Sequence, residues 1–216
     1  MRTDELEGRM RAFETALDPC VLPGVWIVAR LDGRGFTRLT KEVHPFEAPF
    51  DRRFHDHMVQ TAEGLMEGCG LKAAYVHTQS DEISLLFGQD EGGFGRRLRK
   101  LLSVLSGEAS ARFSLLLGSP AVFDCRVSPL PSEEAVVDYF RWRAEDARRN
   151  ALNAHCYWLL RSQGRRAAEA DAALRGLSSS GKHDLLHRHG VNFNDLPVRD
   201  AYSAFLRGLI RPPAGS

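Results

Sequence analysis

Two stretches decide how this chain folds: Arg30-Leu31-Asp32-Gly33-Arg34-Gly35-Phe36 and Gln79-Ser80-Asp81-Glu82-Ile83-Ser84. Each follows an apolar run, and each has a carboxylate at the point where a strand should end or turn. Two carboxylates that meet at one edge of a sheet can hold two Mg²⁺ ions, and Mg²⁺ ions hold phosphates. The two stretches therefore indicate a metal-dependent nucleotidyl transferase, in which the rest of the chain positions a triphosphate and an RNA end.

The order of the expected elements brings these carboxylates together. Apolar, β-branched and aromatic runs predict strands, and apolar residues at helical spacing predict the helices between them. The resulting β-α-β-β-α-β order predicts an α+β, ferredoxin-like antiparallel sheet. In that topology the first and third strands are central neighbours, so Asp32 should lie beside Asp81. The strands are expected at 25–29, 73–77, 83–87 and 120–127, and the two helices at 50–68 and 94–115.

Helices are also expected before and after this core in the sequence. We expect a single domain over residues 1–216, with a catalytic core at 24–130 and a helical C-terminal extension at 131–216. Ser132 is a plausible N-cap for the first helix of the extension. The other expected elements are helices at 2–17, 132–160, 163–173 and 182–189, a loop at 40–49, a turn at 191–197 and a fraying tail at 212–216.

The composition is that of an ordinary globular protein, with 216 residues, 43% hydrophobic and 26% charged residues, and a net charge of +1. A chain so close to neutral must meet any nucleic acid through a local basic patch. Its four cysteines stand far apart, without a C-x-x-C pair, which disfavours a disulfide framework or a structural zinc. We see no signal peptide and no apolar run of about 20 residues, so we expect a cytoplasmic protein without a membrane partner.

Some local signals leave two interpretations open. Residues 32–35 form either a tight turn or a loop whose N–H groups approach phosphate. The basic start of the second helix and the polar stripe of the long helix are either solvated surfaces or contacts to phosphate and RNA. Histidines 183, 187 and 189 lack metal-ligand spacing, so we expect them in solvent. The basic start contains Arg96, Arg97, Arg99 and Lys100, and the stripe contains Arg141, Glu145, Arg148 and Arg149.

Six motifs, in their order along the chain, resemble those of the tRNA-His guanylyltransferase family and of its guanylyltransferase-like branch, the 3′-to-5′ polymerases. The resemblance covers about residues 24 to 197. The motifs are R-x-D-G-R-x-F at 30–36, S-D-E with a following serine at 80–84, F-x-R-R-x-x-K at 94–100, F-D-x-R-V at 123–127, Trp142-Arg143 with Asp146 and Asn150, and V-N-F-N-D-L-P at 191–197.

The resemblance implies a palm-type catalytic domain in which Asp32, Asp81 and the backbone carbonyl of Gly33 coordinate two Mg²⁺ ions. We give Glu82 a lesser catalytic role, in which it helps to position a ligand. ATP, GTP and other nucleoside triphosphates are the implied substrates, tRNA is the implied partner, and a homotetramer (a dimer of dimers) is the implied assembly. The nucleotide is expected on Asp32, Gly33, Arg34, Gly35, Phe36, Thr37, Ser80 and Asp81, and the tRNA or a second triphosphate on Arg96, Arg97, Lys100, Arg148, Asn150 and Lys182.

The chain departs from the family pattern in two places. Where eukaryotic members have H-I-N-N-L-Y-N, residues 148–154 read R-R-N-A-L-N-A. This run is closer to the guanylyltransferase-like members, whose expected role is the repair of 5′-truncated tRNAs. The family segment F-x-K-P reads Phe46-Glu47-Ala48-Pro49, so a lysine expected near the nucleotide is missing. Either some contact to the triphosphate then comes from elsewhere, or the affinity for the triphosphate is lower.

We therefore predict template-dependent 3′-to-5′ addition of nucleotides to the 5′ end of tRNA. Three alternatives remain: non-templated G addition to tRNA-His, a palm-fold nucleotide cyclase, and a catalytically silent tRNA-binding protein. A cyclase would need no RNA-binding surface. A silent protein would have no physical need to keep Asp32, Asp81 and Glu82 crowded together, because like charges repel.

Overall fold

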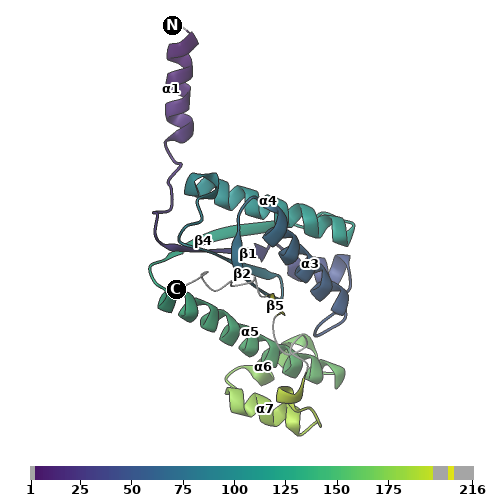
Figure 1. The fold of residues 1–216 in the computed structure, drawn as a ribbon. Helices are drawn as coiled ribbons and strands as arrows, with labels where there is room; N and C mark the ends of the chain where they lie inside the picture. The colour runs from purple at the N-terminus through teal and green to yellow at the C-terminus, as the bar shows by residue number, and fades with distance from the viewer. Residues whose placement is uncertain (1–2, 197–203, 207–216) are drawn as a thin grey trace.

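The computed structural model describes residues 3–196 and 204–206. Its centre is a five-stranded antiparallel sheet with the strand order β4-β1-β3-β2-β5 (Figure 1). Because β1 and β3 are neighbours inside the sheet, the predicted α+β, ferredoxin-like arrangement is confirmed. The strands are β1 (Trp26–Gly33), β2 (Ala73–Gln79), β3 (Glu82–Phe87), β4 (Phe123–Leu130) and β5 (Ala204–Leu206).

Side chains that alternate along the strands give the sheet two different faces. On β1, Ile27 and Leu31 belong to the main hydrophobic cluster. The same cluster contains Leu65 of α3 (Arg52–Gly68) and Leu105 of α4 (Leu98–Leu117). Figure 1 shows α3 and α4 together on one side of the sheet. Polar residues at the even-numbered positions of β1 are therefore directed away from the main core.

Helix α5 (Glu133–Ser162) covers the other face of the sheet (Figure 1). It begins after Ser132, whose hydroxyl accepts a hydrogen bond from the amide of Ala135 at 3.2 Å, as expected of an N-cap. Tyr75 of β2 packs edge-on against Phe140 of α5, with ring centroids 4.8 Å apart. The C-terminal part of α5, from Ala151 onward, forms a second hydrophobic cluster with α6 (Ala167–Leu174), α7 (Ser179–His187) and η3 (Phe193–Asp195).

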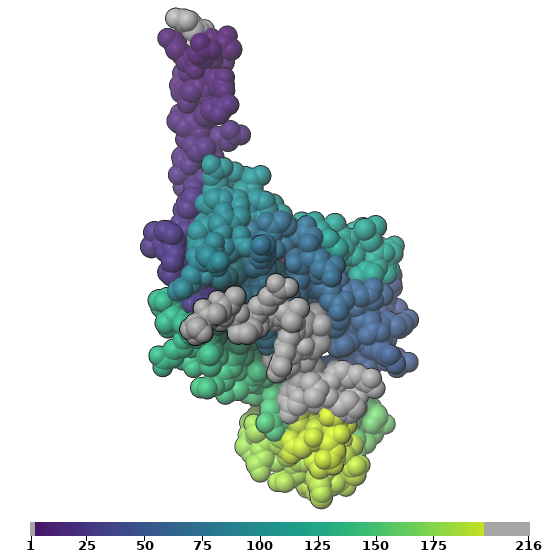
Figure 2. Space-filling model, in the orientation of Figure 1, coloured from purple at the N-terminus to yellow at the C-terminus, as the bar shows by residue number. Residues whose placement is uncertain are grey.

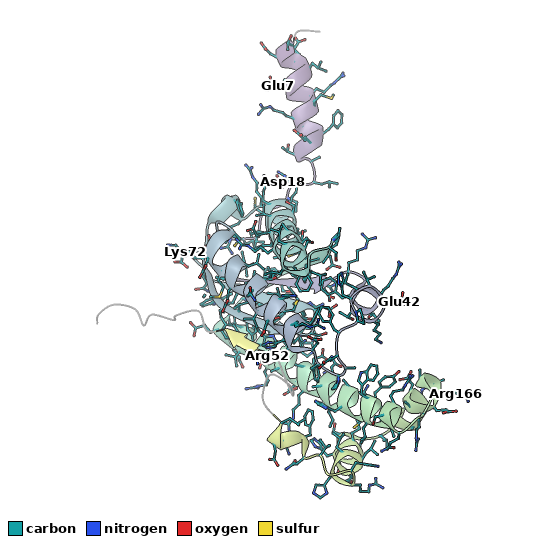
Figure 3. The ribbon with its side chains drawn as sticks, turned by 90° about the vertical axis from the view of Figure 1, so that its right-hand side faces the viewer. Glu7, Asp18, Glu42, Arg52, Lys72 and Arg166 are labelled. Carbon is teal, nitrogen blue, oxygen red and sulfur yellow. The ribbon has the colours of Figure 1, made fainter. Side chains whose placement is uncertain are left out.

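Helix α1 (Thr3–Thr15) projects from the body of the protein (Figures 1 and 2). None of its residues is buried. Figure 3 shows Glu7 of α1 well clear of the body, and it shows Glu42 and Lys72 on opposite sides of that body. Glu42 belongs to η1 (Leu39–Val43), a π-helical turn that follows the short helix α2 (Phe36–Arg38).

Several boundaries differ from the sequence-based expectations. The second helix of the core begins at Leu98 instead of residue 94, because Phe94 and Arg96 both have a φ of 55°, which is incompatible with a right-handed helix. These residues form the 3₁₀ turn η2 (Gly93–Arg96). The loop expected at 40–49 starts instead with the helical turn η1. Strand β5 was not predicted, because among the described residues it pairs with β2, which is distant along the chain.

Two further expectations concern the whole chain. The four cysteines, all within the described part, form no disulfide, in agreement with their spacing. Within residues 3–196 and 204–206, none of the helices combines the length and the apolar character that crossing a membrane requires. The fraying tail expected at 212–216 lies outside the described residues.

Candidate active site

The end of β1 and the turn before β3 lie side by side. In the antiparallel register Asp32 is paired with Glu82. One residue further on, the amide of Gly33 donates a hydrogen bond to the backbone carbonyl of Asp81 at 3.0 Å. The structure therefore brings Asp32 and Asp81 to one edge of the sheet, as the predicted topology requires.

A cation next to Asp81 would stabilise the charged form of its carboxylate. Burial raises the pKa of its carboxyl group, and the negative charge of Asp32 raises it further. Within the described residues no cluster of three or more His, Cys, Asp or Glu side chains could hold a metal ion. Mg²⁺ does not need such a cluster, because one or two carboxylates together with substrate phosphates commonly bind it. Asp32, Asp81 and the carbonyl of Gly33 fit a Mg²⁺ site of this kind.

Aromatic packing fixes the turn that follows Asp32. Phe36 is only 3% exposed and packs against the rings of Phe54, Phe113 and Phe123, at centroid distances of 4.9 to 6.2 Å. A Cβ atom on Gly33 would lie 2.5 Å from the Phe36 ring, so only glycine fits at that position. Phe36, which was expected to bind nucleotide, is mainly an anchor in the core.

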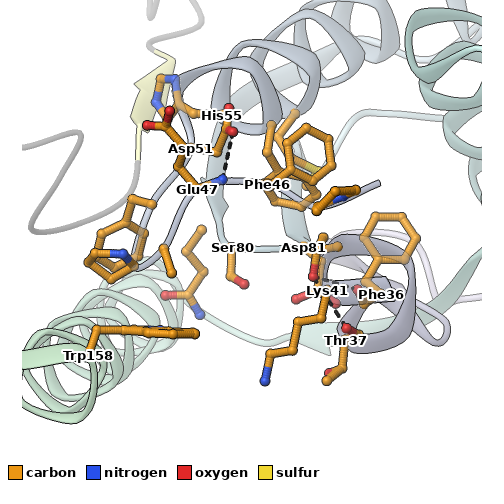
Figure 4. A pocket seen from close by; sticks show the side chains of 18 of the residues that line it. Phe36, Thr37, Lys41, Phe46, Glu47, Asp51, His55, Ser80, Asp81 and Trp158 are labelled. Carbon is orange, nitrogen blue, oxygen red and sulfur yellow. Dashed lines mark hydrogen bonds between the residues drawn. The ribbon is translucent and has the colours of Figure 1, made fainter. Parts of the chain in front are cut away.

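A pocket of about 440 Å³ lies beside Asp81 (Figure 4), a volume in the range typical of ligand sites. Four residues of the expected nucleotide set form part of its wall: Phe36, Thr37, Ser80 and Asp81. The other four do not line the pocket but form the sheet edge and turn next to it: Asp32, Gly33, Arg34 and Gly35. The pocket and the carboxylate pair thus share Asp81.

The pocket also contains residues that the motifs do not predict. Lys41 of η1 and Trp158 of α5 both line it, and Figure 4 shows them on different sides of the pocket. Ala48, which stands where the family pattern has a lysine, lines the same pocket. Lys41 lies in a segment that was expected to be a loop, and Trp158 is brought there by the length of α5. Neither residue carries a local sequence signal for this position.

Glu82 is held in a buried ion network. Its carboxylate accepts from Arg143 of α5 at 3.0 Å and lies 3.5 Å from the guanidinium of Arg30. Glu82 is 8% exposed, and burial raises the pKa of its carboxyl group, although both arginines act in the opposite direction. Arg143 also contacts Asp146 at 3.3 Å. We therefore interpret Glu82 as a positioning residue that ties α5 to the sheet, and no longer as a directly catalytic carboxylate.

The structure corrects the prediction that Arg96, at the basic start of α4, contacts phosphate or RNA. Arg96 is 8% exposed, and its guanidinium donates to the backbone carbonyls of Val21, Val25, Gln89 and Glu91. It therefore has a structural role and is not a phosphate ligand. Since Val25 precedes β1 and Asp32 is near its other end, this site lies roughly 23 Å from the carboxylates, at about 3.3 Å per strand residue.

The other predicted RNA contacts also lie away from the pocket wall. Arg97 is exposed and Lys100 half-buried, both beside Arg96. In the C-terminal helices, Arg148 donates to the side chain of Asn194 at 3.1 Å, and Asn150 donates to Asp146 at 3.3 Å. Lys182 lies on α7, where its carbonyl accepts from Cys156. None of these residues lines the described pocket beside Asp81.

Comparisons with known proteins agree with this geometry. The family model described as tRNAHis guanylyltransferase matches residues 7–131, and the model described as the Thg1 C-terminal domain matches residues 134–203. A probable tRNA(His) guanylyltransferase of Drosophila melanogaster is 36% identical over 200 residues, which cover 88% of this chain and 68% of the relative. The chain thus spans about two thirds of the length of the Drosophila melanogaster and Mus musculus relatives, and about one third of the length of two Arabidopsis thaliana relatives.

Solved structures extend the comparison. The tRNA(His) guanylyltransferase of Saccharomyces cerevisiae superposes with a TM-score of 0.85 at 25% identity, covering 93% of this chain and 92% of that one. A bacterial Thg1-like protein in complex with ATP gives a TM-score of 0.81 at 27% identity, covering 95% and 90%. Such a protein in complex with GTP gives 0.75 at 27% identity, covering 93% and 83%. The chain therefore belongs to the tRNA(His) guanylyltransferase family, whose nucleotidyltransferases act at the 5′ end of tRNA.

Proposed function

We propose that this protein repairs 5′-truncated tRNAs by adding nucleotides in the 3′-to-5′ direction, with the opposite strand as the template. One observation carries the proposal: Asp32 and Asp81 meet at the edge of a palm-like sheet, beside a pocket of suitable size for a nucleotide. Bacterial Thg1-like proteins that share this fold form complexes with ATP and with GTP, which supports a nucleotide in this pocket.

The proposed reaction joins an incoming nucleotide to an activated tRNA end. The 3′-hydroxyl of the incoming nucleoside triphosphate attacks the phosphorus atom of the activated 5′ end. A bond forms between that phosphorus and the 3′ oxygen, and the bond to the leaving group breaks. A triphosphorylated end releases pyrophosphate, and an adenylylated end releases AMP. The hydroxyl proton passes to solvent. Mg²⁺, when bound, would neutralise phosphate charge and lower the pKa of the attacking hydroxyl.

The residues of the chain supply mainly position and charge. Asp32, Asp81 and the carbonyl of Gly33 would hold two Mg²⁺ ions at the sheet edge. The hydroxyl groups of Thr37 and Ser80, both on the pocket wall, can donate hydrogen bonds to phosphate oxygens. This division suits phosphoryl transfer, in which catalysis consists largely of alignment and electrostatic stabilisation.

The template-dependent branch is supported by residues 148–154, which differ from the H-I-N-N-L-Y-N run of eukaryotic members. In addition, two of the similar solved structures are bacterial Thg1-like proteins. G addition to tRNA-His is the second candidate, because the sequence relatives we compared are named tRNA(His) guanylyltransferases. The two functions differ in whether the added base follows the opposite strand.

A single assay separates all the candidates. A 5′-triphosphorylated tRNA that lacks its first nucleotide is incubated with Mg²⁺ and each nucleoside triphosphate in turn, and the products are resolved on a gel. Addition of the nucleotide that completes the acceptor stem supports templated repair, whereas addition of G alone supports the second candidate. Cyclisation of ATP or GTP without RNA would support a cyclase. Binding of the tRNA without any product, by wild type and by Asp32→Asn alike, would support a silent binder.

The exposed apolar side chains of α1 and the following segment support the assembly that we propose, a homotetramer built as a dimer of dimers. Leu6 and Met10 are 41% and 44% exposed, and Phe13 and Leu17 are 72% and 89% exposed. Exposed apolar groups gathered on one projecting element are typical of interfaces. Light scattering after gel filtration tests this proposal: the wild type should have four times the mass of the chain, and Phe13→Glu should reduce that mass.

A further inference from the structure

The wall of the pocket beside Asp81 carries more negative than positive charge. Glu47, Asp51 and Asp81 line it, and Lys41 is the one lysine or arginine among the lining residues that the structure describes. Asp51 is already neutralised, because Arg53 contacts its carboxylate at 2.8 Å and two backbone amides donate to it. A triphosphate in this pocket would therefore meet a single lysine as its side-chain cation.

The surroundings of Lys41 leave its ammonium group available to a ligand. Its neighbours in the helical turn, Arg38 and Glu42, pair with each other at 3.4 Å. Lys41 is exposed and makes no ion pair or side-chain hydrogen bond within the described residues. Figure 4 shows its side chain extending from the wall near Thr37 along the open middle of the pocket. A ligand beside Asp81 and Thr37 would thus lie within the reach of this side chain.

The π-helical turn η1 holds the backbone of Lys41 in place. The turn closes with a hydrogen bond from the amide of His44 to the carbonyl of Leu39 at 2.8 Å. The hydroxyl of Thr40 donates to the carbonyl of Phe36, also at 2.8 Å, and Phe36 is fixed in the core. Single π-turns of this kind are frequent at functional sites. The position of Lys41 is therefore set by the same aromatic anchor that shapes the turn after Asp32.

We propose that Lys41 binds the phosphate chain of the nucleotide in this pocket and replaces the cation that Ala48 cannot supply. Ala48 lines the same pocket, but its methyl group offers neither charge nor a hydrogen-bond donor. A lysine ammonium is a compact charge with three donors, which suits a flexible phosphate chain. The inference rests on the proposed function, since it assumes that a nucleoside triphosphate occupies the pocket.

The test measures the binding of ATP and of adenosine to the full chain by calorimetry in the presence of Mg²⁺. Lys41→Gln should weaken ATP binding about ten- to hundredfold, because a charge-assisted hydrogen bond is lost. The affinity for adenosine should not change, since adenosine has no phosphate. Lys72→Gln is the matched control, because Lys72 is exposed on the other side of the body from η1 (Figure 3), and it should bind ATP like the wild type.

A second variant tests whether the two positions are interchangeable. Adding Ala48→Lys to Lys41→Gln should recover most of the lost ATP affinity, because the new ammonium group enters the same pocket. Equal ATP affinity of the wild type and Lys41→Gln, or an equal loss of adenosine binding, would overturn the role of Lys41 and leave the proposed function standing. Failure of the wild type to bind ATP at all would instead overturn the proposed function and this inference with it.

Discussion

The backbone amide of Gly33 donates a hydrogen bond to the backbone carbonyl of Asp81 at 3.0 Å. This bond continues the antiparallel ladder one step beyond the pair formed by Asp32 and Glu82. The two carboxylates are therefore brought together by the main chain and not by contacts of their own side chains. Consequently, a substitution at either carboxylate should change the charge of the site without changing its shape.

Asp81→Asn should abolish catalysis and yet stabilise the metal-free protein. Folding raises the pKa of the Asp81 carboxyl group above 3.8. The protonated carboxyl group therefore stabilises the folded state below pH 3.8, and this stabilisation is lost as the pH rises through the pKa that Asp81 has in the folded protein. At pH 7 the wild type has lost this contribution, whereas the neutral amide cannot lose it. We expect a higher melting temperature for Asp81→Asn in EDTA, measured by differential scanning fluorimetry.

Mg²⁺ should reverse this order of stabilities. Binding to the native state raises the melting temperature of the wild type, but Asp81→Asn lacks one ligand and should respond little. Its nucleotide addition should fall by about a thousandfold or more, because several kcal/mol of charge stabilisation are lost. A wild-type melting temperature that is insensitive to Mg²⁺ and to a nucleoside triphosphate together would contradict the proposed metal site.

The buried pair of Glu82 and Arg143 should show strong energetic coupling. Glu82→Gln leaves Arg143 with Asp146 as its ion-pair partner, and Arg143→Met leaves Glu82 with Arg30. Each variant removes one partner from a buried ion network and should lower the free energy of unfolding by up to about 3–5 kcal/mol. The double variant should lose less than the sum of the two losses, as measured by urea denaturation. Arg141→Met is the control on α5, because Arg141 forms an exposed ion pair with Asp138 at 3.5 Å. It should change the free energy of unfolding by about 0.5 kcal/mol or less. Additive losses would show that Glu82 and Arg143 act independently.

Gly33→Ala should damage both stability and activity. Its added Cβ would meet the Phe36 ring at 2.5 Å, so either the ring or the turn after Asp32 must move. Overpacking of this kind typically lowers the free energy of unfolding by about 1–3 kcal/mol. Gly107→Ala is the opposite control, because this position of α4 has open space around it, and alanine should stabilise the helix by about 0.5–1 kcal/mol. A neutral Gly33→Ala would mean that the Phe36 ring adjusts freely.

Trp158 should contribute to the binding of the base. It closes the pocket from α5, on a different side from Lys41 (Figure 4), and stacking of a base on an aromatic ring contributes about 1–3 kcal/mol. Trp158→Ala should therefore weaken ATP and GTP binding about tenfold, whereas inorganic tripolyphosphate should bind as before. Leu115→Ala, an exposed apolar position on α4, serves as the control. A uniform loss for all three ligands would indicate damage to the pocket instead.

Local patterns were sufficient to predict four strands of the sheet and the carboxylate pair. Strand and helix periodicity specified the β-α-β-β-α-β order, and that order alone brings Asp32 and Asp81 together. The prediction succeeded because the relevant information is topological and does not depend on exact boundaries.

Features that depend on tertiary packing were not predictable in the same way. The motif around Arg96 gives no sign that four carbonyl groups surround its guanidinium, because Val21, Val25, Gln89 and Glu91 come from two separate segments. The position of Lys41 depends on a π-helical turn that is anchored by Phe36. Trp158 reaches the pocket because α5 continues for about five turns, at 3.6 residues per turn, beyond Phe140, which packs against the sheet. Basic residues in a motif therefore indicated binding less reliably than the paired carboxylates indicated a shared edge.

One measurement tests the central claim most directly. Two 5′-triphosphorylated tRNAs that lack the first nucleotide are prepared, identical except for the base opposite the gap, and each is offered all four nucleoside triphosphates with Mg²⁺. Asp32→Asn serves as the inactive control. We predict that the wild type adds the complementary nucleotide to each tRNA, so that changing the opposite base changes the product. Addition of the same nucleotide to both tRNAs would contradict template-dependent repair.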